Sequence, residues 1–331
     1  SDLDNSKRYN IILIIKNNVD TSSFEFAITV LILTEYAPRL PLPGETLHGT
    51  KFTTSFGGKG ANQCVAAAKL GGNTYMIARV GDDYWGKQYI DNLMKFGINV
   101  TYTKITKEVT TGIAQISVGT NGDNQIVIVP GANNHLNISD INEAQELIKN
   151  ADIIISQLET PFEATYEAFK SCNGIRLLNA APASTNIKDI FEYCHILCVN
   201  EPEASFLVGF EVDLSNIKNA LRKLLDLGCK TAIITLGNNG AAYSKRSDDK
   251  QDEQCIHVRC TKVVAVDTTG AGDAFVGALA KFLVNHRNTP LHQIIGAACD
   301  VATKSVVKEG TQSSFPDNYN PFKVYYEYAI L

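Results

Sequence analysis

From about residue 150 onward, short apolar runs alternate with longer segments whose apolar residues recur at helical spacing. This alternation is typical of βα units that build a parallel sheet, so an α/β fold is expected. Each apolar run ends in small or polar residues. The carboxyl ends of parallel strands lie along one edge of a sheet, where open α/β sheets bind their ligands. The pattern therefore predicts a ligand-binding edge formed by strands at 153–156, 176–178, 196–199, 232–235 and 262–266.

The first 130 residues follow a different pattern. Period-two alternation runs through 46–56 and 110–130 around Asn121-Gly122, a dipeptide favoured in tight hairpin turns. Antiparallel strands that stand apart from the parallel sheet are therefore expected. We predict one domain over 1–331, with a small β lid inserted at approximately 18–56 and 101–128.

Composition narrows the classes of partner. The chain has 331 residues, of which 44% are hydrophobic, so one large core is expected. A net charge of −5 without a local basic patch argues against nucleic acid and against an anionic membrane surface. The eight cysteines form no CxxC pair and are expected to be free thiols in a reducing compartment. A small-molecule substrate is therefore favoured, in the cytoplasm or alternatively the nucleus.

The stretch "AVDTTGAGDAF", residues 265–275, places one acid, Asp273, among small residues after an apolar run. We expect Asp273 in the first turn of a helix, where the amides from Gly270 onward lack helical carbonyl partners and can hold an anion. The alternative is that Asp273 is an ordinary first-turn residue and the glycines form a turn.

The helix itself is predicted by Phe275, Leu279 and Phe282, which repeat on one face, whereas Lys281 is expected to point to water. A dinucleotide-binding fingerprint is excluded, because its third glycine would fall at Phe275.

A second glycine-rich stretch, "TSFGGKGANQCVAAAKLGG", covers 54–72 and leads into another predicted helix. Lys59 and Asn62 would project at the start of that helix, where they could grip a polyhydroxy ligand. The alternative is a tight loop with a solvated lysine. The glycine pattern lacks the ending of a Walker A loop.

Together with "QLE", "NEPEA", "ITLGNNG" and "GTQSSFP", these two stretches resemble the signatures of the ribokinase-like, PfkB-type carbohydrate kinases, and most of all the ribokinase branch. The motifs occur in the right order between Leu42 and Pro316. The resemblance implies a three-layer αβα fold with a mostly parallel central sheet and a small β lid. It also implies ATP-dependent phosphorylation of D-ribose at O5, giving ribose 5-phosphate.

The resemblance assigns roles to the residues around Asp273. Asp273 would be the general base, and the amides of Gly270, Ala271 and Gly272 would form the anion hole for the transferring phosphoryl group. This agrees with the needs of phosphoryl transfer, in which equatorial charge must be stabilised and the hydroxyl proton removed.

Further roles follow by the same resemblance. Asn200 and Glu203 match an NxxE motif that organises Mg²⁺ and phosphate, although by spacing alone Glu203 is better explained as a first-turn helix acid. Thr235, Gly237 and Gly240 match the ATP-binding turn, to which Gly272 would contribute, although a plain strand-to-helix turn is the alternative. The sugar would contact Asn18, Asp20, Gly58, Lys59, Asn62, Glu159 and Asp273.

The family also binds an activating monovalent cation, K⁺, beside the anion hole. The matching positions are Asp267, Thr269, Ser305, Lys308, Gly310 and Ser314. Asp267 could instead be a turn residue that bonds its own backbone. A homodimer through the exposed strands of the lid is expected.

The N-terminal region departs from the family pattern. Ile15-Lys16 stands where the family has a Gly-Ser pair, before the Asn18-x-Asp20 tripeptide. Asp20 lies 24 residues before Gly44, about twice the expected spacing, and 21–33 is unusually apolar for a lid connection. Either the lid carries an extra β element or this part is rearranged.

Two rival functions stay open from the sequence. One is a related kinase of the same superfamily, such as a fructokinase or an adenosine kinase. The other is a catalytically silent protein that binds a sugar or a nucleotide. Ribose-dependent formation of ADP separates these hypotheses.

Overall fold

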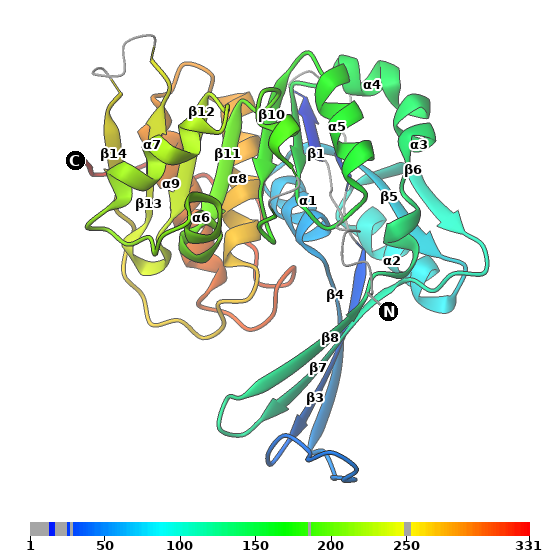
Figure 1. Ribbon diagram of the computed structural model, residues 1–331. Helices are drawn as coiled ribbons and strands as arrows, with labels where there is room; N and C mark the ends of the chain where they lie inside the picture. Colours follow the sequence, from blue (N-terminus) through cyan, green and yellow to red (C-terminus); the bar gives the residue numbers. More distant parts are fainter. Residues whose placement is uncertain (1–12, 17–24, 27–28, 185–186, 248–252) are drawn as a thin grey trace.

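The computed structural model describes residues 13–16, 25–26, 29–184, 187–247 and 253–331. Its strands form one large sheet with helices on both faces and one small sheet that projects from the body (Figure 1). None of the helices in this described part is long and apolar enough to cross a membrane.

Four parallel strands form the middle of the large sheet: β9 (Ile153–Ser156), β10 (Ile175–Asn179), β11 (Ile196–Asn200) and β12 (Thr231–Thr235). They confirm four of the five strands expected from the sequence. Their side chains are almost all buried, because helices cover both faces of the sheet.

Other strands extend the large sheet on both sides. On one side, β13 (Ala241–Lys245), β14 (Cys255–Val258) and β15 (Tyr328–Ile330) follow β12 in antiparallel order. On the other side lie β1 (Leu13–Lys16), β2 (Glu25–Phe26), β5 (Asn73–Gly81) and β6 (Asn99–Thr106). Strand β1 runs antiparallel to both β9 and β5.

The fifth expected strand, 262–266, is wrong. The residues run as an irregular segment, with Val264 90% exposed and Val266 61% exposed. Strand β15 already pairs with the free edge of β14, so the segment 262–266 cannot add to the sheet there. Its end is instead tied to Val306, whose carbonyl accepts from the Val266 and Asp267 amides at 2.7 and 3.2 Å.

The helices form two layers around the large sheet (Figure 1). One face carries α1 (Lys59–Lys69), α2 (Tyr84–Lys95), α8 (Ala271–Asn285) and α9 (Leu291–Ser305). The other carries α3 (Ile138–Glu143), α4 (Gln145–Lys149), α5 (Phe162–Ser171), α6 (Glu201–Val208) and α7 (Ile217–Asp226). Short 3₁₀ turns lie at Gly131–His135, Lys188–Ile190 and Gly237–Asn239.

Helix α8 is more deeply buried than its sequence predicts. It packs between α1 and α9, and a Cβ at Gly277 would lie 2.3 Å from the Gln63 carbonyl of α1. The prediction that Lys281 points to water is therefore wrong. Lys281 is 8% exposed and donates from Nζ to the Gly71 carbonyl, just beyond the end of α1, at 2.8 Å. A cation there complements the helix dipole.

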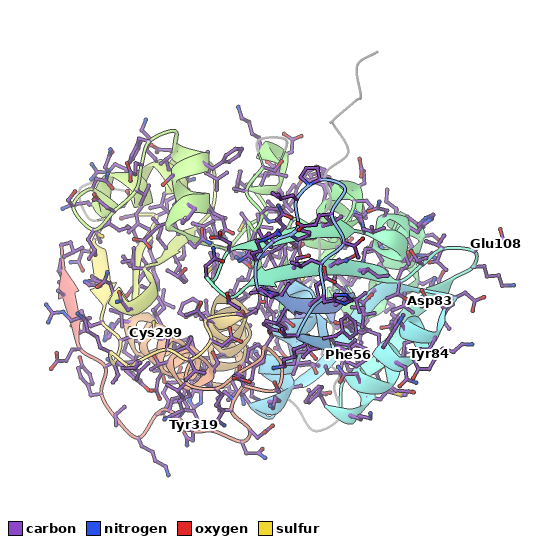
Figure 2. The ribbon with its side chains drawn as sticks, turned by 90° about the horizontal axis from the view of Figure 1, so that it is seen from below. Phe56, Asp83, Tyr84, Glu108, Cys299 and Tyr319 are labelled. Atoms are coloured by element: carbon purple, nitrogen blue, oxygen red, sulfur yellow. The ribbon has the colours of Figure 1, made fainter. Side chains whose placement is uncertain are left out.

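The small sheet has the order β4 (Lys51–Gly57), β3 (Val30–Ala37), β7 (Gly112–Gly119) and β8 (Asn124–Val129). Strands β7 and β8 form the hairpin predicted around Asn121-Gly122, with φ 89° at Gly122. Seen from below, this sheet lies across the middle of the body (Figure 2).

The extent of the small sheet differs from the predicted lid ranges. Residues 101–106 belong to β6, which pairs with β5 in the large sheet, so the insertion is 30–57 and 112–129. Part of the apolar surplus at 21–33 enters β3, where Val30 and Leu31 are buried.

Candidate active site

Helix α8 begins without a side-chain cap. Its N-cap is Gly270, with φ 77°, and a Cβ built there would lie 2.3 Å from Thr311 Cγ2. Both the left-handed backbone and this close approach require glycine. At Gly272 an added Cβ would meet no atom within 4 Å, so the start of the helix faces open space.

Two of the three amides predicted to hold an anion are available. Within the described ranges, the Gly270 and Gly272 amides donate to no protein acceptor. The Ala271 amide differs from the prediction, because it donates to the Thr268 carbonyl at 3.2 Å and is engaged in the turn. The Asp273 amide is unpaired in the same way as its glycine neighbours. An uncapped helix start of this kind attracts anions.

The carboxylate of Asp273 is held on both of its oxygens. Asn62 Nδ2 donates to Oδ2 at 2.8 Å, and Gln63 Nε2 donates to Oδ1 at 2.9 Å. Burial raises the pKa of Asp273, while the charge of Lys59 and the two amide donors oppose the rise. Each oxygen keeps a further lone pair, so the oriented carboxylate can still accept a proton.

Lys59, the first residue of α1, interacts electrostatically with three acids. Burial lowers the pKa of Lys59, but Glu159, Asp273 and Glu203 together outweigh burial and raise it. Burial also raises the pKa of Glu203. Three carboxylates and one lysine leave a net negative charge at this site. Such a charge favours a substrate that carries a bound cation.

Glu159 is the most perturbed acid of the site. Its pKa is raised to about 7, mainly by burial and against the opposing charge of Lys59. Its Oε2 is buried and has no hydrogen-bond partner among the described residues, and the same is true of Gln157 Oε1 and Thr160 Oγ1 nearby in sequence. Unpartnered buried acceptors are costly unless a ligand supplies donors, so this corner fits the hydroxyl groups of a sugar.

Asn200 and Glu203 form a reciprocal cap at the start of α6. Asn200 Oδ1 accepts from the Glu203 amide at 2.8 Å, and Glu203 Oε2 accepts from the Asn200 amide at 2.9 Å. The first-turn interpretation of Glu203 is therefore correct locally. Its other carboxylate oxygen remains available to a ligand.

A cavity of about 230 Å³ adjoins the start of α8. Thr235, Gly237 and Gly240 line it together with Ala271 and Gly272, as expected for a nucleotide site that reaches the anion hole. Its remaining wall is largely apolar and includes Val263, Phe275, Ala302, Val306, Cys260 and Cys299, the last of which is labelled in Figure 2.

Some of the positions predicted for a monovalent cation contact one another. Asp267 Oδ1 accepts from the Thr269 amide and Oδ2 from the Gly310 amide, each at 2.9 Å. Burial raises the pKa of Asp267, but these donors outweigh it and lower the pKa overall. Asp267 thus joins 267–269 to the loop that follows α9 and carries Lys308 and Ser314. It is also the turn residue of the alternative interpretation.

Some of the predicted cation ligands already take part in other hydrogen bonds. The Ser305 carbonyl accepts from the Lys308 amide at 3.2 Å, and Ser314 Oγ donates to the Thr311 carbonyl at 2.8 Å. No cluster of three or more His, Cys, Asp or Glu residues in the described part of the chain could hold a metal ion by itself.

Of the other residues predicted to bind the sugar, Gly58 is described by the structure, whereas Asn18 and Asp20 are not. Gly58 caps α1 with φ 99° and adjoins Lys59. Asn18 and Asp20 lie outside the described residues, so their role stays a prediction. Sequence reasoning overlooked Gln63 and Gln157, although both stand inside the quoted motifs "GANQ" and "QLE".

The start of α8 thus offers free amides and an oriented carboxylate next to an apolar cavity, with buried acceptors at Glu159. These features suit the transfer of a phosphoryl group to a sugar hydroxyl. The chain belongs to the pfkB family of carbohydrate kinases, whose family model matches residues 23–318. The family and fold expected from the sequence motifs are confirmed.

Individual relatives cover most of the chain. A ribokinase of Mus musculus is 40% identical over 289 residues, which cover 86% of this chain and 88% of the relative. A deoxyribokinase of Salmonella typhi is 39% identical, with coverages of 86% and 92%. The Arabidopsis thaliana ribokinase structure with ribose and ATP is 28% identical and has a TM-score of 0.80, with coverages of 90% and 96%.

Proposed function

We propose that this protein transfers the terminal phosphoryl group of ATP to O5 of D-ribose, giving ADP and ribose 5-phosphate. The main observation behind this proposal is that Asn62 and Gln63 hold both carboxylate oxygens of Asp273 at the uncapped start of α8. The relatives named ribokinase, at 34–40% identity over most of the chain, support ribose as the substrate.

The residues of the site have separate roles in the proposed reaction. Glu159 Oε2, which has no partner in the described part of the chain, would accept from a sugar hydroxyl. Lys59 and Asn62 would orient the ring with the Gly58 backbone. Asp273 would take the O5 proton as the bond to phosphorus forms. The Gly270 and Gly272 amides would donate to the phosphoryl oxygens, where charge spreads in the transition state. Asn18 and Asp20 remain proposed sugar ligands.

The charge of the site fits a divalent cation brought with ATP. Three carboxylates and one lysine face the reaction centre, and Glu203 keeps one oxygen without a protein donor. We propose that Asn200 and Glu203 would hold Mg²⁺ through water, which suits an ion that retains its hydration shell. The ion would neutralise phosphate charge when bound.

The late loop fits a monovalent cation. Two amide donors lower the pKa of Asp267, Gly310 and Ser314 lie on the loop joined to it, and Ser305 ends α9 just before that loop. We propose that these residues with Thr269 and Lys308 would hold K⁺, largely through oxygen atoms, and that K⁺ would stiffen the loop.

Ribose-dependent release of ADP tests the function. Purified protein with ATP and Mg²⁺ is assayed with ribose, 2-deoxyribose, fructose and adenosine, with and without K⁺. We expect the highest kcat/KM with ribose and an increase with K⁺. The 39% identity to a deoxyribokinase makes 2-deoxyribose the second candidate. ATP and ribose binding without any turnover would favour a silent binding protein.

We also propose a homodimer formed through the small sheet. Strand β8 is an edge strand, and its Ile126, Val127, Ile128 and Val129 are each at least half exposed. Such an apolar edge is a natural pairing surface. Light scattering should give twice the chain mass, and Ile128→Lys should give the mass of one chain. All eight cysteines are free, which supports the proposed cytoplasmic or nuclear location.

A further inference from the structure

Two chains of side-chain amides converge on Asp273. The longer chain starts on α2, where Asn92 Nδ2 donates to Gln312 Oε1 at 3.0 Å. Gln312 Nε2 then donates to Asn62 Oδ1 at 3.1 Å, and Asn62 Nδ2 donates to Asp273 Oδ2 at 2.8 Å. Every step points towards the carboxylate.

The shorter chain has the same polarity. Gln157 Nε2 donates to Gln63 Oε1, and Gln63 Nε2 donates to Asp273 Oδ1 and to Asn179 Oδ1, both at 2.9 Å. Gln63 and Gln157 are fully buried, and Asn62 and Gln312 are each 6% exposed. Water therefore competes little with these bonds.

The direction of each amide is set by the residue behind it. An amide group has a donor end and an acceptor end of nearly equal size, so rotation by half a turn exchanges them. If Gln312 offered an oxygen to Asn62, Asn62 would gain by turning its own nitrogen towards Gln312. Its oxygen would then face Asp273 Oδ2, and attraction would become repulsion.

We propose that Gln312 and Asn92 are positioning residues for the catalytic base, acting through Asn62. Hydrogen bonds in such a chain polarise one another, so the far members strengthen the bond at the carboxylate. Gln312 stands two residues after Gly310, which bonds Asp267, so the same residue joins the late loop to the base. The proposal rests on the proposed function, in which Asp273 is the base.

A purely structural role for Gln312 makes a different prediction. Lys69 Nζ donates to the Gln312 carbonyl at 3.2 Å, so the residue also anchors its loop to α1. If anchoring were its whole role, side-chain changes would lower stability and leave the ionisation of Asp273 unchanged.

The decisive variant is Gln312→Glu, which keeps the size of the side chain. Its ionised carboxylate can accept from Asn92 but cannot donate to Asn62. We expect kcat to fall about tenfold to a hundredfold, as for loss of a hydrogen bond to a charged group. The acid limb of the kcat–pH profile should move to higher pH, because Asp273 loses a donor that opposes the rise of its pKa and is active only when ionised.

Other ionisable groups must be considered in reading that profile. Tyr89 and Lys69 adjoin Gln312. Lys59, Glu159 and Glu203 act on Asp273 or on its neighbours. These groups are unchanged in the variant, but the new carboxylate at position 312 also raises the pKa of Asp273 by its charge. Gln312→Met removes the donor to Asn62 without adding a charge, so it should shift the acid limb in the same direction if the chain positions the base, and leave it unshifted if charge alone is responsible.

Gln293→Glu is the matched control. Gln293 is 8% exposed, donates to the Tyr326 carbonyl at 2.8 Å and accepts from the Tyr326 amide at 2.9 Å, far along α9 from the site. This control should lose stability comparably and keep the wild-type pH profile. Asn92→Asp should shift the acid limb in the same direction as Gln312→Glu, and less, since the reversal passes through two amides.

A second readout does not depend on turnover. The ¹³C carboxyl signal of Asp273 in the ligand-free protein, assigned by its loss in Asp273→Asn, should titrate at higher pH in Gln312→Glu than in wild type. If the titration shifts but the protein does not phosphorylate sugars, the role of the amide chain is supported and the proposed function is overturned. Wild-type titration and pH profiles in both variants, with stability lowered as in Gln293→Glu, would overturn the relay.

Discussion

Two helices begin in this site, and their first turns are built in opposite ways. At α6, Asn200 and Glu203 satisfy each other's backbone amides. At α8, Gly270 provides no side-chain cap, and the Gly272 amide has no acceptor among the described residues. A capped start stabilises the fold, whereas an uncapped start gives up that stabilisation and keeps its donors for an anion. The comparison supports the proposal that α8 is the catalytic end and α6 its support.

The largest expected effect comes from removing the base at the open end. Asp273→Asn preserves shape but cannot accept the hydroxyl proton, so kcat should fall by roughly 10²–10⁴. Titration calorimetry should show little change in ribose affinity. Wild-type turnover in this variant would contradict the assignment of Asp273.

Filling the open end should have the next largest effect. A Cβ added at Gly272 would meet no atom within 4 Å, so Gly272→Val should still fold, with a small change in Tm. It would occupy the space of the phosphoryl group, and kcat should fall by about 10²–10³ through loss of an amide donor. A change confined to KM would count against the anion hole.

The burial of Glu159 should also reduce stability at high pH in protein without ligand. The pKa of Glu159 is raised from 4.5 to about 7, so its ionised form disfavours the folded state, and stability falls as pH rises between these values. Glu159→Gln should abolish this fall and raise the free energy of unfolding at pH 8 by up to about 3 kcal/mol. Urea denaturation at pH 5 and pH 8, without ligand, measures it.

The same Glu159→Gln variant should bind ribose more weakly, because a carboxylate acceptor has become an amide. An unaltered pH dependence of stability would mean that Glu159 is not the residue that ionises in this range.

The smallest effect is expected at the capped helix. Asn200→Ala removes one half of the reciprocal cap and should lower the free energy of unfolding by about 1 kcal/mol. Chemical denaturation of the variant beside wild type provides the measurement. Turnover should suffer far less than in Gly272→Val, and a larger loss of turnover than in Gly272→Val would reverse the comparison between the two helices.

The sequence predicted the parts of the fold that local pattern determines. Strands β9 to β12 and the helix after Asp273 follow from apolar period and strand ends. The segment 262–266 looks like a strand, but β15, from the distant C-terminal segment, occupies the available edge. Lys281 lies on the face of α8 that the sequence pattern predicts to be polar and exposed. Neighbouring helices cover that face too.

The site shows the same division. Asp273, Lys59 and Glu203 are visible because short motifs carry them. The amide chain from Asn92 through Gln312 to Asn62 joins residues up to 250 positions apart, and no local period encodes it. Gln312 stands in the quoted motif "GTQSSFP", so its presence was visible while its partner was not.

The most direct test of the open end of α8 is a crystal structure with ribose, ADP and aluminium fluoride, a mimic of the transferring phosphoryl group. The account predicts fluoride within hydrogen-bond distance of the Gly272 amide and ribose O5 within hydrogen-bond distance of an Asp273 oxygen. Fluoride bound away from α8, or O5 turned from Asp273, would contradict it.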